Sequence, residues 1–187
     1  MSKDRMKIYL VRHGEAAASW RDSDDPSLSA LGHRQAAATA QKLAGHVDSG
    51  VCLVSSPLQR ALETALPLSK TLDTEISIIE AYREIPAPVA RAERQTWLQS
   101  IVRQSWSEQH EMVREWHRAL LQQLKLIRQP TVVFTHFMVL NAIVGALTAK
   151  DQIVRFLPDN ASVTTVELKD GSLQLLELGQ QLRTVVN

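Results

Sequence analysis

A short apolar run near the N-terminus ends abruptly in polar side chains. Residues 8–15 read IYLVRHGE, so Arg12, His13 and Gly14 follow directly after four apolar residues. A continuous apolar run that contains β-branched and aromatic residues is typical of a strand covered on both faces. Gly14 allows a sharp turn, and open α/β sheets bind ligands beyond the carboxyl ends of their strands. Taken alone, these residues also fit a surface charge pair after a strand.

The composition fits one globular domain. The chain has 187 residues, of which 44% are hydrophobic and 22% charged, and this is ordinary for a domain with a proper core. Its 21 basic and 20 acidic side chains nearly cancel, so no nucleic-acid partner is expected. Any anion-binding site must therefore be a local cluster.

Targeting and redox signals are sparse. Residues 1–7 are polar, and no apolar run is long enough to cross a bilayer, so we expect a cytoplasmic protein without a membrane partner. The one cysteine, Cys52, lies in an apolar segment. It is expected to pack in the core, with a catalytic thiol as the alternative.

Predicted strands and helices alternate along most of the chain. Strands are predicted at residues 8–11, 50–54, 75–79 and 131–135. Helices are predicted from Ser29 as N-cap to Gly45, from Ser56 with Pro57 at the first position, over 91–128 as two helices that meet near Ser105, and over 138–147. This alternation predicts a three-layer α/β/α domain with a mostly parallel central sheet.

The C-terminal part predicts an antiparallel hairpin. Residues 162–168 and 173–178 alternate in polarity around Asp170 and Gly171, a strong turn signal. We therefore expect a single domain over residues 1–187, in which residues 86–128 form a helical cover over the active site. The apolar stripe within that cover contains Val113, Trp116, Leu120, Leu124 and Ile127.

Charged and titratable side chains follow four of the predicted strands. Arg12 and His13 follow the first, Arg60 lies in the helix after the second, Glu84 follows the third, and His136 follows the fourth. Helical side chains lean toward the N-terminus, so Arg60 can reach the same crevice as Arg12. A cationic pocket of this kind suits a phosphate monoester, which is largely a dianion that arginine binds bidentately.

These residue types also suit phosphoryl transfer. A neutral imidazole in line with phosphorus can act as a nucleophile. A carboxylic acid can protonate the leaving alkoxide and later accept a proton from water. Because the arginines can stabilise the phosphoryl charge, no metal and no cofactor are expected.

Several motifs together resemble the histidine phosphatase superfamily, in its phosphoglycerate mutase-like branch. The matching segments are residues 10–15 (LVRHGE), 28–32 (LSALG), 55–61 (SSPLQRA), 82–85 (YREI) and the pair Thr135 and His136. The resemblance implies that His13 is the phosphorylated nucleophile and Glu84 the proton donor. It also implies that Arg12, Arg60 and His136 bind the phosphoryl group.

The sequence departs from the family pattern in three places. Phe137 stands where a glycine usually follows the second histidine, and residues 16–18 are alanines where mutase-type members carry polar residues. Residues 86–88 read PAP in place of the usual glycine and tryptophan. The fewer polar contacts and the modest lid favour hydrolysis over mutase chemistry.

Some assignments remain open from the residues alone. Glu80 is the rival of Glu84 for the acid role, and Glu15 is expected to orient Arg12 or Arg60 as an ion-pair partner. The loop over residues 16–26 is expected at the rim of the pocket. The other histidines, His33, His46, His110 and His117, are expected at the surface or half-buried, and Trp97, Trp106 and Trp116 either pack in the core or line the pocket.

The predicted function is hydrolysis of a phosphomonoester through a phosphohistidine on His13. The substrate is a phosphorylated small molecule or a phosphoprotein. Alternatives are a phosphohistidine phosphoprotein phosphatase and a phosphoglycerate-type mutase, and, from another class, a non-catalytic phosphate-binding scaffold.

Overall fold

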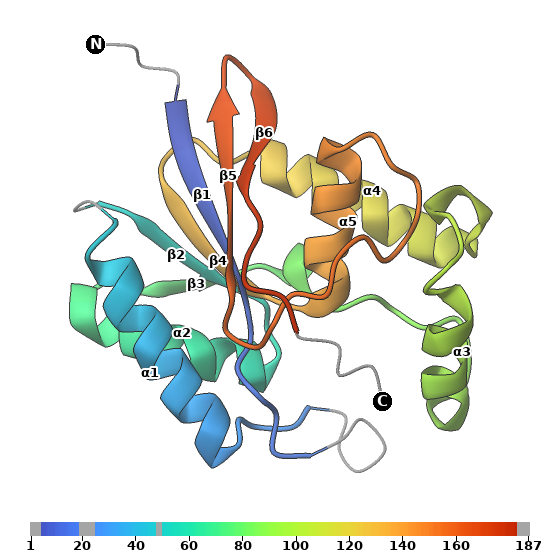
Figure 1. Cartoon of the computed structure of the whole chain (residues 1–187), viewed down its shortest axis with the longest axis horizontal. Helices are drawn as coiled ribbons and strands as arrows, with labels where there is room; N and C mark the ends of the chain where they lie inside the picture. The colour runs from blue at the N-terminus through green and yellow to red at the C-terminus, as the bar shows by residue number, and fades with distance from the viewer. Residues whose placement is uncertain (1–4, 19–24, 48–49, 183–187) are drawn as a thin grey trace.

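The computed structural model describes residues 5–18, 25–47 and 50–182, and these form one six-stranded sheet in the order β3-β2-β4-β1-β5-β6 (Figure 1). The strands are β1 (Arg5–Arg12), β2 (Cys52–Ser55), β3 (Ile76–Ile78), β4 (Thr131–Thr135), β5 (Val163–Lys169) and β6 (Ser172–Glu177). The strands from β1 to β4 pair in parallel, whereas β5 pairs antiparallel with β1, and β6 pairs antiparallel with β5 at the edge of the sheet.

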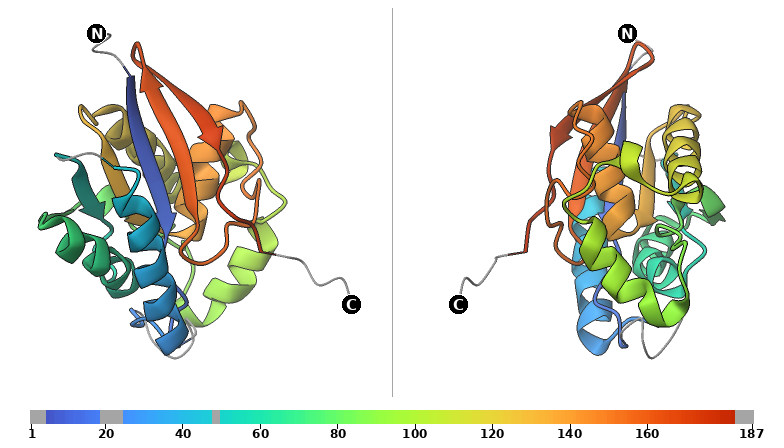
Figure 2. Two further views of the ribbon diagram at one scale, coloured as in Figure 1. Left: turned by 60° about the vertical axis from the view of Figure 1, so that its left-hand side comes forward. Right: turned by 90° about the vertical axis from the view of Figure 1, so that its right-hand side faces the viewer.

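Helices cover both faces of this sheet (Figures 1 and 2). On one face lie α1 (Ala30–Ala44) and α2 (Gln59–Leu72), and on the other lie α4 (Glu111–Lys125) and α5 (Phe137–Leu147). The remaining elements are α3 (Arg94–Ile101) and the 3-10 helices η1 (Glu80–Tyr82), η2 (Arg91–Glu93) and η3 (Trp106–Glu108). The predicted three-layer α/β/α fold with a C-terminal hairpin is confirmed.

Strand β1 shows why its apolar run is continuous. Ile8 and Leu10 belong to the core beneath α4 and α5, whereas Tyr9 and Val11 belong to the core beneath α1 and α2. Side chains of a strand alternate between the two faces of its sheet, so both sets are buried only when both faces are covered. Arg12 and His13 come after this covered part of the strand, at the end of β1, where the chain leaves the sheet.

Most predicted element ends agree with the structure, but the start of α2 does not. Ser29 caps α1 by accepting a hydrogen bond from the Gly32 amide, and Gly45 ends that helix, as expected. The predicted cap Ser56 is wrong, because α2 begins at Gln59 with Leu58 as its N-cap. The Ser56 hydroxyl lies instead 2.7 Å from the ring of His136.

The region expected as a helical cover divides into two parts. Val113, Leu120 and Leu124 of α4 are fully buried in the main core, so α4 belongs to the layer on the sheet. By contrast, α3 lies at the edge of the molecule, away from the sheet (Figure 1). Two helices separated near Ser105 are therefore confirmed, and only the part before α4 lies outside the helical layer.

The remaining expectations concern single residues. Asp170 and Gly171 both have positive φ, 49° and 76°, as the tight turn between β5 and β6 requires. Cys52 is half-buried and contacts the side chain of Gln129, so the expected core position is wrong.

Trp106 is buried in the core, while Trp97 and Trp116 are half-buried against it. No helix in the described residues is long and apolar enough to cross a membrane.

Candidate active site

Two histidines meet where neighbouring parallel strands end. Arg12 of β1 is in register with Thr135 of β4, so the residues that follow, His13 and His136, leave the sheet side by side. Their ring centroids are 5.2 Å apart. Arg60, in the first turn of α2, reaches the same place from the next strand, and its Nε lies 3.2 Å from Nε2 of His13. Strand pairing thus brings together two histidines that are far apart in the sequence.

The hydrogen bonds of His13 define its tautomer. Nδ1 lies 2.7 Å from the Gly14 carbonyl oxygen, which can only accept, so Nδ1 carries the hydrogen. Nε2 therefore has the lone pair, which accepts a hydrogen bond from Arg60. Burial, and then the charges of Arg60 and Arg12, lower the pKa of His13 to about 3. The imidazole is consequently neutral at physiological pH, with a nucleophilic nitrogen facing a cation.

The turn after His13 is fixed by backbone packing against α1. A Cβ on Gly14 would lie 2.6 Å from the carbonyl oxygen of Gly32, and a Cβ on Gly32 would lie 2.1 Å from that of Glu15. The Gly14 amide also donates to Thr64 Oγ1, whose hydroxyl donates to the Arg60 carbonyl. The loop that carries His13 and the helix that carries Arg60 are therefore held together.

Arg12 is held from two sides. Its Nη1 donates to the Pro158 carbonyl oxygen at 2.8 Å, and its guanidinium carbon lies 5.4 Å from the centre of the Phe137 ring. This distance is that of a cation–π contact. Phe137, which replaces the usual glycine, therefore forms a wall against which Arg12 is placed. Burial lowers the pKa of Arg12, opposed by the carboxylates of Glu84 and Asp159.

Arg60 is almost fully buried and meets a carboxylate of the loop before α1. Its Nη1 lies 3.7 Å from Asp25, which also accepts a hydrogen bond from the Gln59 amide. Burial lowers the pKa of Arg60, and the charges of Glu84 and Asp25 oppose that shift. Of the loop expected at the rim, residues 19–24 lie outside the described residues, and Asp25 lies at the site.

Glu84 is buried at the N-terminus of α5. Its Oε1 accepts hydrogen bonds from the amides of Ile85 at 3.0 Å and Met138 at 3.2 Å. These amides and the charge of Arg60 favour the carboxylate, but burial outweighs them and raises the pKa of Glu84. The side chain is thus suited to hold a proton in a site that also contains two arginines.

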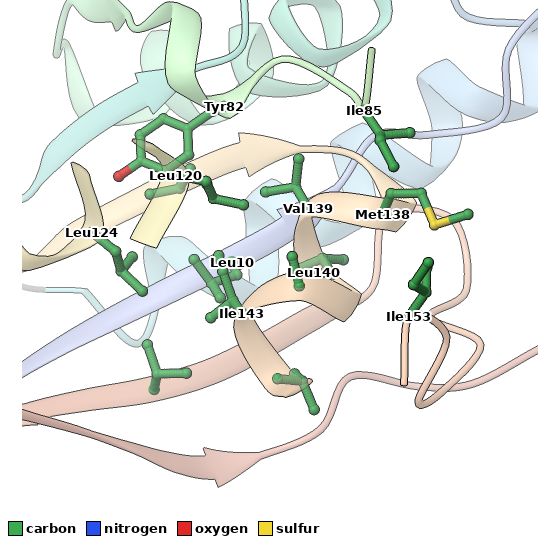
Figure 3. Close-up of a cluster of buried hydrophobic side chains, with 14 of the residues drawn as sticks. Leu10, Tyr82, Ile85, Leu120, Leu124, Met138, Val139, Leu140, Ile143 and Ile153 are labelled. Carbon is green, nitrogen blue, oxygen red and sulfur yellow. The ribbon is translucent and has the colours of Figure 1, made fainter. Parts of the chain in front are cut away.

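Three side chains hold the backbone on either side of Glu84. Thr135 donates to the Tyr82 carbonyl oxygen at 2.8 Å and Trp116 to that of Arg83 at 3.0 Å. Arg94 donates to the Ile85 carbonyl oxygen at 2.8 Å. The side chains of Tyr82 and Ile85 project into the core (Figure 3). Glu84 therefore lies on a segment that β4, α4, α3 and the core all hold in place.

The structure separates the two candidate acids and corrects the expectation for Glu15. Glu80 is exposed and pairs with Arg83 at 3.0 Å, outside the site. Glu15 accepts a hydrogen bond from the Ser29 hydroxyl at 2.6 Å and makes no ion pair with either arginine among the described contacts. The expected ion pair is wrong because the close packing of Gly14 on Gly32 holds Glu15 beside the N-terminus of α1.

The other histidines lie outside this cluster. His33 and His46 are exposed on or next to α1, the exposed His110 caps α4, and the half-buried His117 stacks on Trp106. Across residues 5–18, 25–47 and 50–182, no group of three or more His, Cys, Asp or Glu side chains is arranged to hold a metal ion.

The sequence reasoning missed the residues that position the site. No sequence pattern indicates that Thr135, Trp116 and Arg94 support the segment around Glu84, and the pattern at Ser56 indicates a helix cap. Only Thr135 and Ser56 carried a local signal, as polar residues at the ends of buried strands.

Known proteins share both this sequence pattern and this fold. The model of the histidine phosphatase superfamily (branch 1) matches residues 8–181. A metal-independent phosphoserine phosphatase of Arabidopsis thaliana is 41% identical over 69 residues, which are 35% of this chain and 29% of that protein. The match thus spans less than a third of that relative.

Solved structures resemble the chain over nearly its whole length. A phosphoserine phosphatase of Entamoeba histolytica, solved in complex with 3-phosphoglyceric acid, has a TM-score of 0.73 and 23% identity, covering 94% of this chain and 98% of that one. A phosphoglycerate mutase of Bacillus anthracis has a TM-score of 0.70 and 15% identity, covering 94% and 93%. At such identities these likenesses establish the fold. By its match over residues 8–181, the chain belongs to branch 1 of the histidine phosphatase superfamily.

Proposed function

We propose that the protein is a metal-independent phosphatase that hydrolyses a phosphomonoester through a phosphohistidine on His13. The observation that carries this proposal is the state of the His13 ring. It is neutral, its hydrogen is held on Nδ1 by the Gly14 carbonyl, and its Nε2 lone pair faces Arg60. A neutral imidazole with its lone pair on Nε2 is the form that can attack phosphorus.

In the first step the phosphoryl group replaces the Arg60 hydrogen bond at Nε2 of His13. Arg12 and Arg60 bind its oxygens and offset their negative charge, and His136 binds the same group. Nε2 attacks phosphorus as the bond to the ester oxygen breaks, and the electron pair leaves with that oxygen. Glu84, whose pKa burial raises, gives its proton to the leaving alkoxide.

In the second step water removes the phosphoryl group. The Glu84 carboxylate takes a proton from water, and the oxygen attacks phosphorus as the P–N bond breaks. The electron pair returns to Nε2 of His13, and inorganic phosphate leaves. Both side chains are then in their starting states.

The proposal extends to the substrate class: a small phosphorylated carboxylic acid is the class that the relatives favour. The relatives named above include a phosphoserine phosphatase and a structure that holds 3-phosphoglyceric acid. The proposal includes residues 86–108 as the cover of this site within a single domain over residues 1–187.

The alternatives fit the site less well. A scaffold that only binds phosphate needs no buried proton donor, whereas Glu84 is 6% exposed beside the phosphate-binding side chains. A mutase must keep its phosphorylated state from water, and the alanines at residues 16–18 offer no polar contacts to the transferred group.

The test is direct detection of the intermediate. Rapid quenching in alkaline denaturant during turnover of a ³²P-labelled phosphomonoester should trap a phosphoryl group on the wild type and on His110→Ala, whose histidine is exposed, and later acidification should release it. It should be absent from His13→Ala, together with hydrolysis. If His13→Ala keeps the wild-type rate, the mechanism is wrong. Comparison of phosphoserine, phosphoglycerates, sugar phosphates and phosphohistidine peptides then ranks the substrate classes.

A further inference from the structure

A buried hydroxyl lies against the second histidine of the site. Ser56 and His136 are both fully buried, and Ser56 Oγ lies 2.7 Å from His136 Nε2. The same oxygen accepts a hydrogen bond from the Leu58 amide at 3.3 Å. The other ring nitrogen, His136 Nδ1, is buried without a hydrogen-bond partner in the described part of the chain.

The backbone fixes Ser56 independently of His136. Ser55 of β2 is in register with Phe134 of β4, and the Ser56 amide donates to the Phe134 carbonyl at 2.9 Å. Ser56 therefore faces the chain that leaves β4 two residues later at His136. Strand pairing places the hydroxyl and the imidazole together, which explains why Ser56 does not cap α2.

Two arrangements of hydrogens are possible, and they differ in how many buried groups lack a partner. If His136 carried its hydrogen on Nε2, Ser56 Oγ would accept from both Leu58 and His136, and its own O–H would have no partner. The lone pair on Nδ1 would also be unpaired. If the hydrogen is on Nδ1, Ser56 donates to Nε2 and accepts from Leu58, so only the Nδ1–H group is unpaired. Because an unpaired buried polar group is costly, the second arrangement is favoured.

We infer that Ser56 is a positioning residue that holds His136 in the Nδ1–H tautomer, so that this N–H donates to the transferred phosphoryl group. The inference deepens the proposed function and rests on it. The unpaired Nδ1–H group of His136 can bind the substrate, because phosphoryl oxygens only accept hydrogen bonds. The opposite tautomer would direct a lone pair toward negatively charged oxygens.

The tautomer matters because His136 carries a single ring hydrogen. Burial, and then the neighbouring His13 ring and the charge of Arg60, hold the pKa of His136 well below its usual value, so the ring stays neutral. A neutral imidazole donates from one nitrogen only, and the group bonded to the other nitrogen decides which one. Ser56 is the described residue that bonds the other nitrogen.

The direct test reads the tautomer without turnover. Long-range ¹H–¹⁵N correlation spectra of the full chain, with ¹⁵N-labelled histidine and His136 assigned through His136→Gln, distinguish the two forms. The wild type and Ser55→Ala should show the Nδ1–H form, because Ser55 is equally buried but bonds only the Ser56 carbonyl. Ser56→Ala should show a mixture or the opposite form, and Ser56→Thr should restore the wild-type spectrum. An Nε2–H form in the wild type, or an unchanged spectrum in Ser56→Ala, overturns the inference.

A kinetic test separates positioning from structure. Ser56→Ala should lower kcat/KM and weaken orthovanadate inhibition, each by about 10- to 100-fold, because the phosphoryl group loses a fixed donor. Ser55→Ala should keep the wild-type values, and Ser56→Thr should recover most of the loss. The melting temperatures of Ser56→Ala and Ser56→Thr are measured alongside. If both variants melt below the wild type and the wild-type spectrum shows the Nε2–H form, the role of Ser56 is structural and the inference is wrong. Loss of the dependence on His13 would instead overturn the proposed function and leave the tautomer result intact.

Discussion

Arg60 donates a hydrogen bond from its Nε to Nε2 of His13 at a distance of 3.2 Å. A side chain proposed to bind the phosphoryl group thus occupies the lone pair that is proposed to attack phosphorus. The incoming group must replace this bond, and the guanidinium exchanges a neutral acceptor for anionic oxygens. Until then, the charge of Arg60 disfavours protonation of His13, so the nucleophile is ready before substrate arrives.

Replacement of Arg60 should raise the pKa of His13. Burial is the largest cause of its lowered pKa and remains in Arg60→Gln, whereas the second cause, the Arg60 charge, is removed. We expect the value to rise from about 3 but to stay below the ordinary 6.5. An NMR titration of the His13 ring measures it, with the exposed Arg114→Gln as control. An unchanged value in Arg60→Gln would contradict the electrostatic account of this site.

Removal of the acid should affect poor leaving groups most. Glu84→Gln keeps the size of the buried side chain but has no proton of comparable acidity to donate. We expect kcat/KM to fall about 10²- to 10⁴-fold for alkyl phosphates, and far less for nitrophenyl phosphate, whose leaving group needs little protonation. Glu80→Gln is the matched control, since that carboxylate is exposed and pairs with Arg83. Equal slowing of both substrates by Glu84→Gln would mean that another group is the acid.

Gly32→Ala should lower both the stability and the activity of the protein. The added Cβ would lie 2.1 Å from the Glu15 carbonyl oxygen, which belongs to the backbone of the loop that carries His13. Relief of this overlap must shift the loop, at a cost of about 1–3 kcal/mol and a large loss of kcat. In the control Gly45→Ala the nearest atom is 3.7 Å away, an ordinary contact. Thermal unfolding and kcat measure both effects, and equal behaviour of the two variants would refute the packing argument.

The sequence predicts the fold well because its signals are local. The run at residues 8–11 is buried on both faces, Ser29 and Gly45 bound α1, and Asp170 with Gly171 forms the turn between β5 and β6. Each of these depends on a few neighbouring residues. The start of α2 was predicted wrongly because the hydroxyl of Ser56 has a partner eighty positions away, which no local pattern contains.

In the candidate site, too, features that depend on local sequence could be predicted, and features that depend on distant contacts could not. Residues that end strands could be grouped from sequence, because parallel strands bring their carboxyl ends to one edge. The supports of the site could not, since Trp116 and Arg94 reach backbone carbonyls beside Glu84 from helices with no fixed spacing to it. The partner of Glu15 was also beyond reach, because it depends on the contact between Gly14 and Gly32.

The depressed pKa of His13 should make the folded protein less stable in mild acid. Between the ordinary value of 6.5 and about 3, the unfolded chain binds a proton at His13 that the folded chain does not. Stability therefore falls as the pH falls through this window, by about 2 kcal/mol from this residue at about pH 5. His13→Gln removes that contribution, so its free energy of unfolding should decrease less than that of the wild type between about pH 7.5 and about pH 5. Urea unfolding at the two pH values measures the difference, with His110→Gln as a control that should follow the wild type. Parallel changes in His13→Gln and the wild type would show that the His13 ring is not held neutral by the fold.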